Sequence, residues 1–202
     1  TWSGEGGGVL LNQCPHNLDL WQWICGMPSK VYTKMQFGKW HDIEVEDDVT
    51  TIVEYPNGAT GTFVTTTGDW PGSNRLEITM DKAKIVVENN VIHLWELEMK
   101  EQEFTVTNKI PFCQPQFTYR QVEAPGLETA HCGVLNAWAG NILRGEPLVA
   151  GGEEGINGLS ISNAMHMSAW TGKEVQLPID DEVYYQMLME RVKTSRRKEN
   201  VN

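Results

Sequence analysis

Three polar side chains near the start of the chain could act together on a bound molecule. Asn12, His16 and Asp19 stand four and three residues apart. If one helix contains all three, this spacing places them on the same face. A histidine at the start of a helix, beside a glycine-rich turn, can reach a small molecule and exchange a proton near neutral pH. The same spacing fits a structural interpretation, in which Asn12 caps the helix, Asp19 faces solvent and His16 is an ordinary surface residue.

The glycines that precede these residues do not form a dinucleotide-binding fingerprint. That fingerprint needs a strand, a GxGxxG turn and a helix in succession, with an acidic residue about twenty positions later. No strand pattern precedes Gly6, Gly7 and Gly8, and their spacing differs from the fingerprint. We therefore expect these glycines to permit a close approach of the backbone to a ligand or to a neighbouring element.

The other histidines and the densest acidic run are weaker candidates. His93 lies in a strand pattern and is expected on a sheet face, whereas His131 and His166 fall on separate predicted helices, where each could reach a polar pocket. Residues 44–48 are acidic but lack the alternating ligand spacing of a calcium loop, so we expect a solvated loop there and no metal site. The chain contains no GxSxG, HExxH or Walker motif.

The four cysteines show no CxxC pair and no tight His/Cys spacing, which argues against a zinc site or a thioredoxin-type motif. We interpret them as reduced core thiols of a cytoplasmic protein. They are Cys14, Cys25, Cys113 and Cys132.

A single helix over residues 12–25 is predicted to position His16. Asn12 would be its N-cap, and Pro15 would lie in the first turn, where its missing N–H leaves no hydrogen bond unmade. Gly26 is expected to end the helix. The helix has an apolar stripe at helical spacing, formed by Cys14, Leu18, Trp21 and Cys25.

The middle of the chain alternates with period two and predicts an antiparallel meander, because its connectors are too short for parallel crossovers. The predicted strands are 31–37, 49–55, 60–67, 75–80, 84–88, 91–98 and 103–109. Helices over 128–144 and 153–171, a strand over 175–178 and a final helix capped by Asp180 are predicted to follow. Strands followed by helices indicate an α+β fold, here a large open, mainly antiparallel sheet with helices on one face.

Length and charge set limits on the class of protein. The chain has 202 residues and a net charge of −11. Such an acidic protein repels phosphate backbones and anionic lipid, so neither nucleic acid nor a membrane is an expected partner. No apolar run approaches the ~18 residues that a membrane helix needs. Apolar residues on both sides of several strands predict that a second copy covers the sheet, which gives a homodimer. The chain begins at Thr1, which suggests a piece of a longer protein.

The stretch from Gly6 to Trp23 resembles the GGGxLxDxGxHxxDxxxW motif of the glucose–fructose oxidoreductase, inositol dehydrogenase and MocA family. Two later stretches are also similar to this family: 54–61, and 145–148 followed by 151–156 and 160–164. Members pair a Rossmann domain with a C-terminal α/β domain. The Rossmann fingerprint and the catalytic lysine of the EKP-type motif are absent from this sequence.

The resemblance implies that residues 1–202 form a single C-terminal substrate-binding and dimerisation domain of an NAD(P)-dependent oxidoreductase. The substrate would be a sugar, a cyclitol or a related polyol, and NAD or NADP would be bound mainly by the other domain. His16 inherits the proton-transfer role of the motif. Asn12 stands where the family has Asp, so it would hold a hydroxyl or orient His16, and His131 would join the substrate pocket. The alternative is a non-catalytic dimerisation or carbohydrate-binding module.

Overall fold

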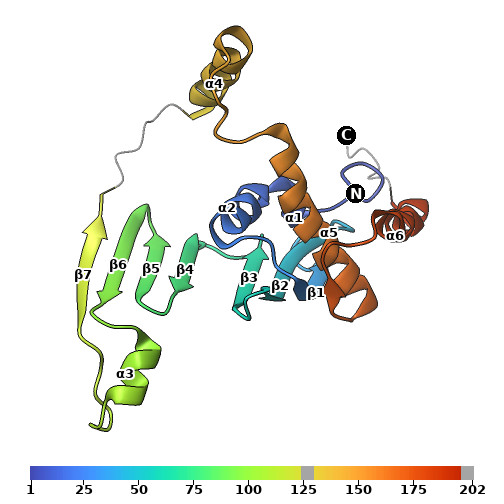
Figure 1. Ribbon diagram of the computed structural model, residues 1–202. Coiled ribbons are helices and arrows are strands. Elements are labelled where there is room, and N and C mark those ends of the chain that lie inside the picture. The colour runs from blue at the N-terminus through green and yellow to red at the C-terminus, as the bar shows by residue number, and fades with distance from the viewer. Residues whose placement is uncertain (124–129, 197–202) are drawn as a thin grey trace. The chain divides into compact units, whose positions relative to one another are not determined.

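The computed structural model describes residues 1–123 and 130–196 and contains two compact units. The first unit comprises Thr1–Gly68 and Leu148–Asn202, and the second comprises Asp69–Pro147 (Figure 1). Each unit contains one four-stranded antiparallel sheet and helices, which confirms the α+β class. None of the helices in the described ranges is both long enough and apolar enough to cross a membrane.

In the first unit the strands have the order β3-β2-β1-β8. Its strands are β1 (Lys30–Phe37), β2 (Glu46–Glu54), β3 (Thr60–Thr66) and β8 (Val175–Gln176). Its helices are α1 (Val9–Asn12), α2 (Pro15–Cys25), η1 (Gly152–Glu154), α5 (Gly155–Thr171) and α6 (Asp181–Thr194). A tight turn joins β2 to its antiparallel neighbour β3, with Gly58 in the left-handed region at φ 85°.

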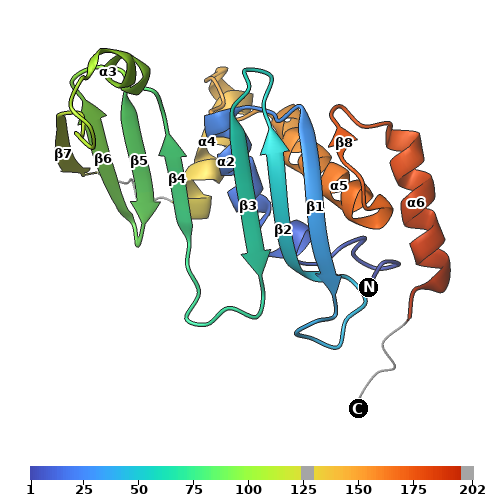
Figure 2. The ribbon, with the colours of Figure 1, turned by 90° about the horizontal axis from the view of Figure 1, so that it is seen from below.

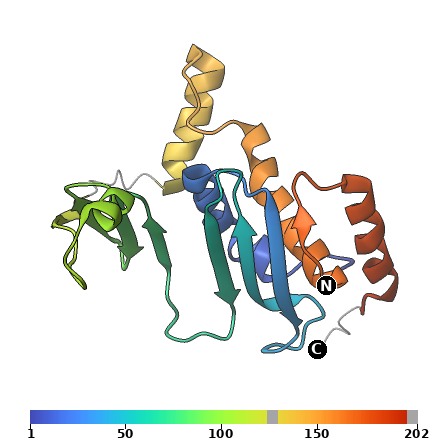
Figure 3. The same cartoon turned by 60° about the horizontal axis from the view of Figure 1, so that its bottom comes forward.

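The helices α2 and α5 cover one face of the first sheet (Figures 2 and 3). The residues beneath them alternate along each strand, so that Val31, Val49 and Val53 are buried. Thr33 and Thr51 lie between these residues, with their hydroxyls 3.0 Å apart. Side chains on the opposite face are exposed, including Tyr32, Ile52 and Val64.

The prediction of one helix over residues 12–25 is wrong. The segment contains two helices, and the break falls at Gln13 and Cys14. Pro15 explains the break, because a proline disfavours helical backbone in the residue before it. Cys14 is therefore the N-cap of α2, and Asn12 is the last residue of α1. Gly26 ends α2 with φ 80°, as expected.

The second unit has the strand order β4-β5-β6-β7. Its elements are β4 (Arg75–Thr79), β5 (Ala83–Glu88), β6 (Val91–Leu97), α3 (Glu101–Thr107), β7 (Phe117–Val122) and α4 (Ala130–Arg144). The strand predicted over 103–109 is wrong, because this segment is the helix α3. Glu101 and Glu103 lie in its first turn, where acidic side chains are stabilising. The fourth strand, β7, is one that the sequence patterns miss.

Several exposures differ from the sequence interpretation. Cys14 is buried and Cys25 half-buried, but Cys113 and Cys132 are exposed, so these two are not core thiols. The last helix, α6, has the predicted cap: Asp180 accepts hydrogen bonds from the amides of residues 182 and 183. Its buried side chain is Tyr184, whereas the neighbouring Val183 is 46% exposed.

Candidate functional site

The glycine-rich segment at the start of the chain lies against a buried carboxylate. The amide of Gly8 is 2.8 Å from both oxygens of Glu46, and the amide of Leu10 is 3.1 Å from Oε1. A Cβ on Gly8 would lie 2.1 Å from the Glu46 carbonyl oxygen, so no larger residue fits there. The expected close approach is therefore to a neighbouring element, the first residue of β2.

Glu46 faces a histidine on α5. His166 Nε2 lies 3.1 Å from Glu46 Oε2, and both side chains are fully buried. His166 Nδ1 is 2.9 Å from the Ser162 carbonyl oxygen. Because Nδ1 faces a carbonyl oxygen, it is the ring nitrogen that donates there, and Nε2 is turned toward the carboxylate. The two side chains therefore form a buried carboxylate–imidazole pair.

The charged form of Glu46 is favoured despite its burial. Burial alone would raise the pKa of this carboxyl, but the contacts with His166 and the Gly8 amide outweigh it, so the pKa lies below its ordinary value. The carboxylate affects nearby groups in turn. Together with burial, which is the larger cause, it raises the pKa of the Cys14 thiol to about 11 and that of the Tyr184 hydroxyl to about 12.

The expectation of a solvated loop over residues 44–48 is wrong. Glu46 and Asp47 are fully buried, and β2 begins at Glu46. Asp47 accepts hydrogen bonds from three successive amides of the β1–β2 connection, those of residues 39, 40 and 41. Each carboxylate takes the place of missing backbone partners, which is why the run lies inside the protein.

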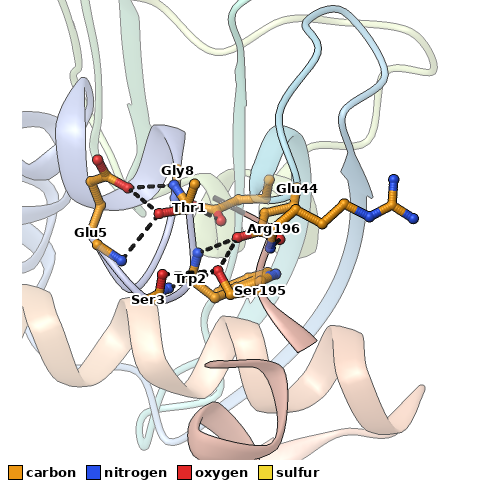
Figure 4. A network of polar contacts seen from close by, with 10 residues as sticks. Thr1, Trp2, Ser3, Glu5, Gly8, Glu44, Ser195 and Arg196 are labelled. Atoms are coloured by element: carbon orange, nitrogen blue, oxygen red, sulfur yellow. Dashed lines mark hydrogen bonds and ion pairs between the residues drawn. The ribbon is translucent and has the colours of Figure 1, made fainter. Parts of the chain in front are cut away.

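Glu44 fastens the N-terminal residues to the end of the described chain (Figure 4). Its carboxylate accepts hydrogen bonds from the Trp2 amide and the Arg196 amide, both at 2.8 Å, and from the Ser195 hydroxyl. The Trp2 side chain is buried, and its ring meets the His166 ring edge-on, with centroids 6.0 Å apart. Trp2 therefore covers the buried pair.

The structure places His16 in the first turn of α2, where its side chain is exposed. Asn12 is also exposed, four residues earlier at the end of α1. Asp19, one turn after His16, accepts a hydrogen bond of 3.1 Å from Gln22 Nε2. The first unit thus presents Asn12 and His16 to solvent on consecutive helices, which leaves both free to meet a small molecule.

His131 belongs to the second unit, where it is exposed on α4. His93 is on a sheet face, as predicted, and its Nδ1 lies 2.8 Å from the Tyr119 hydroxyl. It lines an open hollow of about 450 Å³ together with Trp95 and the charged residues of β4 and β5. No group of three His, Cys, Asp or Glu side chains that could hold a metal occurs within residues 1–123 and 130–196.

Sequence reasoning missed the pairing of Glu46 with His166. The alternation of β2 continues backward through Val49, Asp47 and Val45, but by itself it would place Glu46 on the opposite face of the strand, so it does not indicate this pairing. The partner histidine is 120 positions away, so no local pattern could indicate it.

Residues 1–86 match the family model described as the GFO/IDH/MocA C-terminal domain, which confirms the resemblance seen in the sequence. The match covers 86 of the 202 residues. No curated protein matches the chain.

Solved structures share the fold at low sequence identity. The chain is similar to the WlbA dehydrogenase from Bordetella pertussis, solved with NADH and UDP-GlcNAcA, at a TM-score of 0.62 and 22% identity over 86% of this chain and 46% of that one. An aldose-aldose oxidoreductase from Caulobacter crescentus, complexed with glycerol, is similar at a TM-score of 0.66 and 20% identity, over 85% of this chain and 48% of that one. A levoglucosan dehydrogenase in complex with NADH and levoglucosan is similar at a TM-score of 0.66 and 17% identity, over 89% of this chain and 54% of that one. The chain thus spans about half the length of these enzymes.

Proposed function

We propose that this chain is the substrate-side domain of an NAD(P)-dependent oxidoreductase that acts on a hydroxyl or carbonyl carbon of a sugar, a cyclitol or a related polyol. The observation that carries the proposal is the exposed His16, at the motif position of a segment that matches the family model. The three solved structures compared above are dehydrogenases or oxidoreductases, and two of them were solved with NADH and a sugar or sugar derivative. The four free cysteines suit the reducing environment of the cytoplasm.

In this proposal His16 moves the proton and Asn12 holds the substrate. Oxidation of an alcohol requires a base at the hydroxyl while hydride leaves the carbon, and an imidazole suits that role near neutral pH. The Asn12 amide can donate to or accept from a hydroxyl but cannot take its proton. His16 therefore acts without the carboxylate that the family motif has at this position. His131, exposed on α4, stays a prediction that rests on the family resemblance of the sequence.

The cofactor would be NAD or NADP, which accepts or donates the hydride. The glycine-rich amides of this chain do not fit its phosphates. Backbone amides at the start of a helix can bind phosphate, but the amides of Gly8 and Leu10 are already held by the Glu46 carboxylate. We therefore assign phosphate binding to a part of the protein outside this chain.

Replacement of His16 tests the proposal. In the intact enzyme, His16→Ala should lower turnover ~10²–10⁴-fold, because the general base is lost. Binding of the nicotinamide cofactor, measured by calorimetry, should stay nearly unchanged. The matched control is His41→Ala. His41 is also exposed, and its hydrogen bond to Asp47 is made by its backbone amide, which the substitution keeps. Full turnover of the His16→Ala enzyme would refute the assignment.

The second candidate is a module that associates with its own copy. The uncovered face of the first sheet carries Tyr32 opposite Ile52 on paired strands, with Val64 nearby and 64% exposed. Apolar side chains on an open sheet face are a usual site of self-association. We expect a dimer in sedimentation analysis, and Ile52→Lys should yield monomers. Equal mass for both proteins, or a monomeric parent, would exclude this face as the interface.

A further inference from the structure

The buried carboxylate of Glu46 is connected to His16 through the backbone of α1. Glu46 holds the Gly8 and Leu10 amides at the start of this short helix. The Val9 carbonyl then accepts from the Cys14 amide at 3.0 Å and faces the Cys14 thiol at 3.1 Å. The Cys14 carbonyl in turn accepts from the amides of residues 17 and 18 in the first turn of α2. His16 lies in that turn.

The position of Glu46 itself is determined by contacts from three directions. It begins β2, where it pairs with Phe37 of β1 just beyond a register shift in the ladder. His166 on α5 faces the carboxylate, with Nε2 3.1 Å from Oε2, and the buried Trp2 packs against the histidine ring. A carboxylate without such partners would be strongly unfavourable in this interior, so Glu46 and His166 must stay together.

Both side chains are fully buried and do not reach a substrate themselves, so the pair would act on the site through the backbone of α1. A helix of four residues is not stable by itself and takes its position from its contacts. The contacts at its start include the hydrogen bonds that the Gly8 and Leu10 amides donate to Glu46, and its last residue is the proposed substrate contact Asn12.

We propose that Glu46, held by His166, is a positioning residue for Asn12 and His16. This inference rests on the proposed oxidoreductase function, because it assigns Glu46 a role in the same site. Loss of the carboxylate would let α1 move relative to the sheet, and a misplacement of about 1 Å can cost ~10²-fold in rate.

The test compares Glu46→Gln with Thr51→Val. Thr51 lies on the same strand in the same buried layer and bonds only to Thr33 among the contacts of its side chain, so its loss perturbs the core without touching α1. Amide hydrogen exchange at residues 8–14 should become about 10- to 100-fold faster in Glu46→Gln, and the NMR signals of the His16 ring should shift. Thr51→Val should leave the exchange of α1, relative to the rest of the first unit, and the His16 signals unchanged.

The kinetic arm separates positioning from stability. In the intact enzyme Glu46→Gln should lower kcat ~10²-fold while KM for the cofactor stays constant. Thr51→Val should retain kcat. If both variants change exchange and kcat equally, Glu46 has only a structural role and the inference is overturned. If His16→Ala retains turnover while Glu46→Gln still frees α1, the proposed function fails and the mechanical link stands.

A second variant keeps the inference testable if Glu46→Gln does not fold. Gly8→Ala leaves both buried side chains intact but forces the start of α1 away from the Glu46 carbonyl. It should reproduce the faster exchange and the shifted His16 signals. Gly158→Ala is the matched control, because a Cβ there meets its nearest atom at 3.8 Å. Unchanged His16 signals in Gly8→Ala would contradict the link.

Discussion

Carboxylates have opposite surroundings in the two units of this protein. In the first unit Glu46 and Asp47 are fully buried, and each gathers several backbone amides. In the second unit Glu77 and Glu88 lie on an exposed sheet face, where Arg75 bridges both. The carboxylates of Glu46 and Asp47 accept hydrogen bonds from amides in place of backbone acceptors. Those of Glu77 and Glu88 only pair with a side chain that water also solvates.

This difference determines what each group does for the structure. A buried carboxylate must be compensated, so it holds the segments that compensate it in one arrangement. An exposed ion pair gains little, because solvent screens it and both side chains lose freedom. The first unit therefore derives its geometry at α1 from charge, and the second unit derives its sheet from strand pairing.

The largest expected effect is that of Glu46→Ala. This change removes the carboxylate that faces the buried His166 ring and leaves the Gly8 and Leu10 amides without their acceptor. Removal of one partner of a buried pair typically costs about 3–5 kcal/mol. Urea denaturation, followed by amide exchange so that the units are distinguished, should show the loss in the first unit. A loss of stability spread equally over both units would show that the buried carboxylate does not stabilise the first unit in particular.

Acid should remove the same stabilisation. Because the pKa of Glu46 is lower in the folded protein than its ordinary value of 4.5, the carboxylate stabilises the fold above that value. The contribution is lost as the pH falls through the lower, folded pKa. The stability difference between the parent protein and Glu46→Gln should therefore shrink as the pH falls below about 5. A difference that is constant with pH would show that the charge of Glu46 is not what matters.

The smallest expected effect is that of Glu77→Gln in the second unit. Its contacts with Arg75 and Lys84 are exposed ion pairs, so the urea midpoint should not move measurably. Added salt should likewise have no detectable effect on the variant relative to the parent. A clear loss of stability would show that the exposed ion pairs of Glu77 do hold this sheet together, so that the two units would not differ in the way described above.

Local chemistry made part of this structure predictable. Gly58 requires a tight turn, Asp180 caps α6, and Gly26 ends α2, because each depends only on neighbours in sequence. The exposed His16 could be found for a similar reason, since its motif is continuous.

The buried pair could not be found in this way. Charged residues are usually solvated, and the groups that compensate Glu46 are backbone amides and a histidine 120 positions away, neither of which leaves a pattern near the acidic run. The segment of α3 misled for a different reason: Phe104 and Val106 alternate as in a strand, but the acidic residues before them favour the helix.

Trp2 has a consequence for any shortened form of this protein. Its ring covers His166, and its amide is tied to Glu44, which also binds residues 195 and 196. A truncation that begins at Gly6 would therefore expose the His166 ring to water and remove one of the donors that hold the Glu44 carboxylate in place. Any tag or domain joined to the N-terminus must leave the Trp2 indole packed against His166.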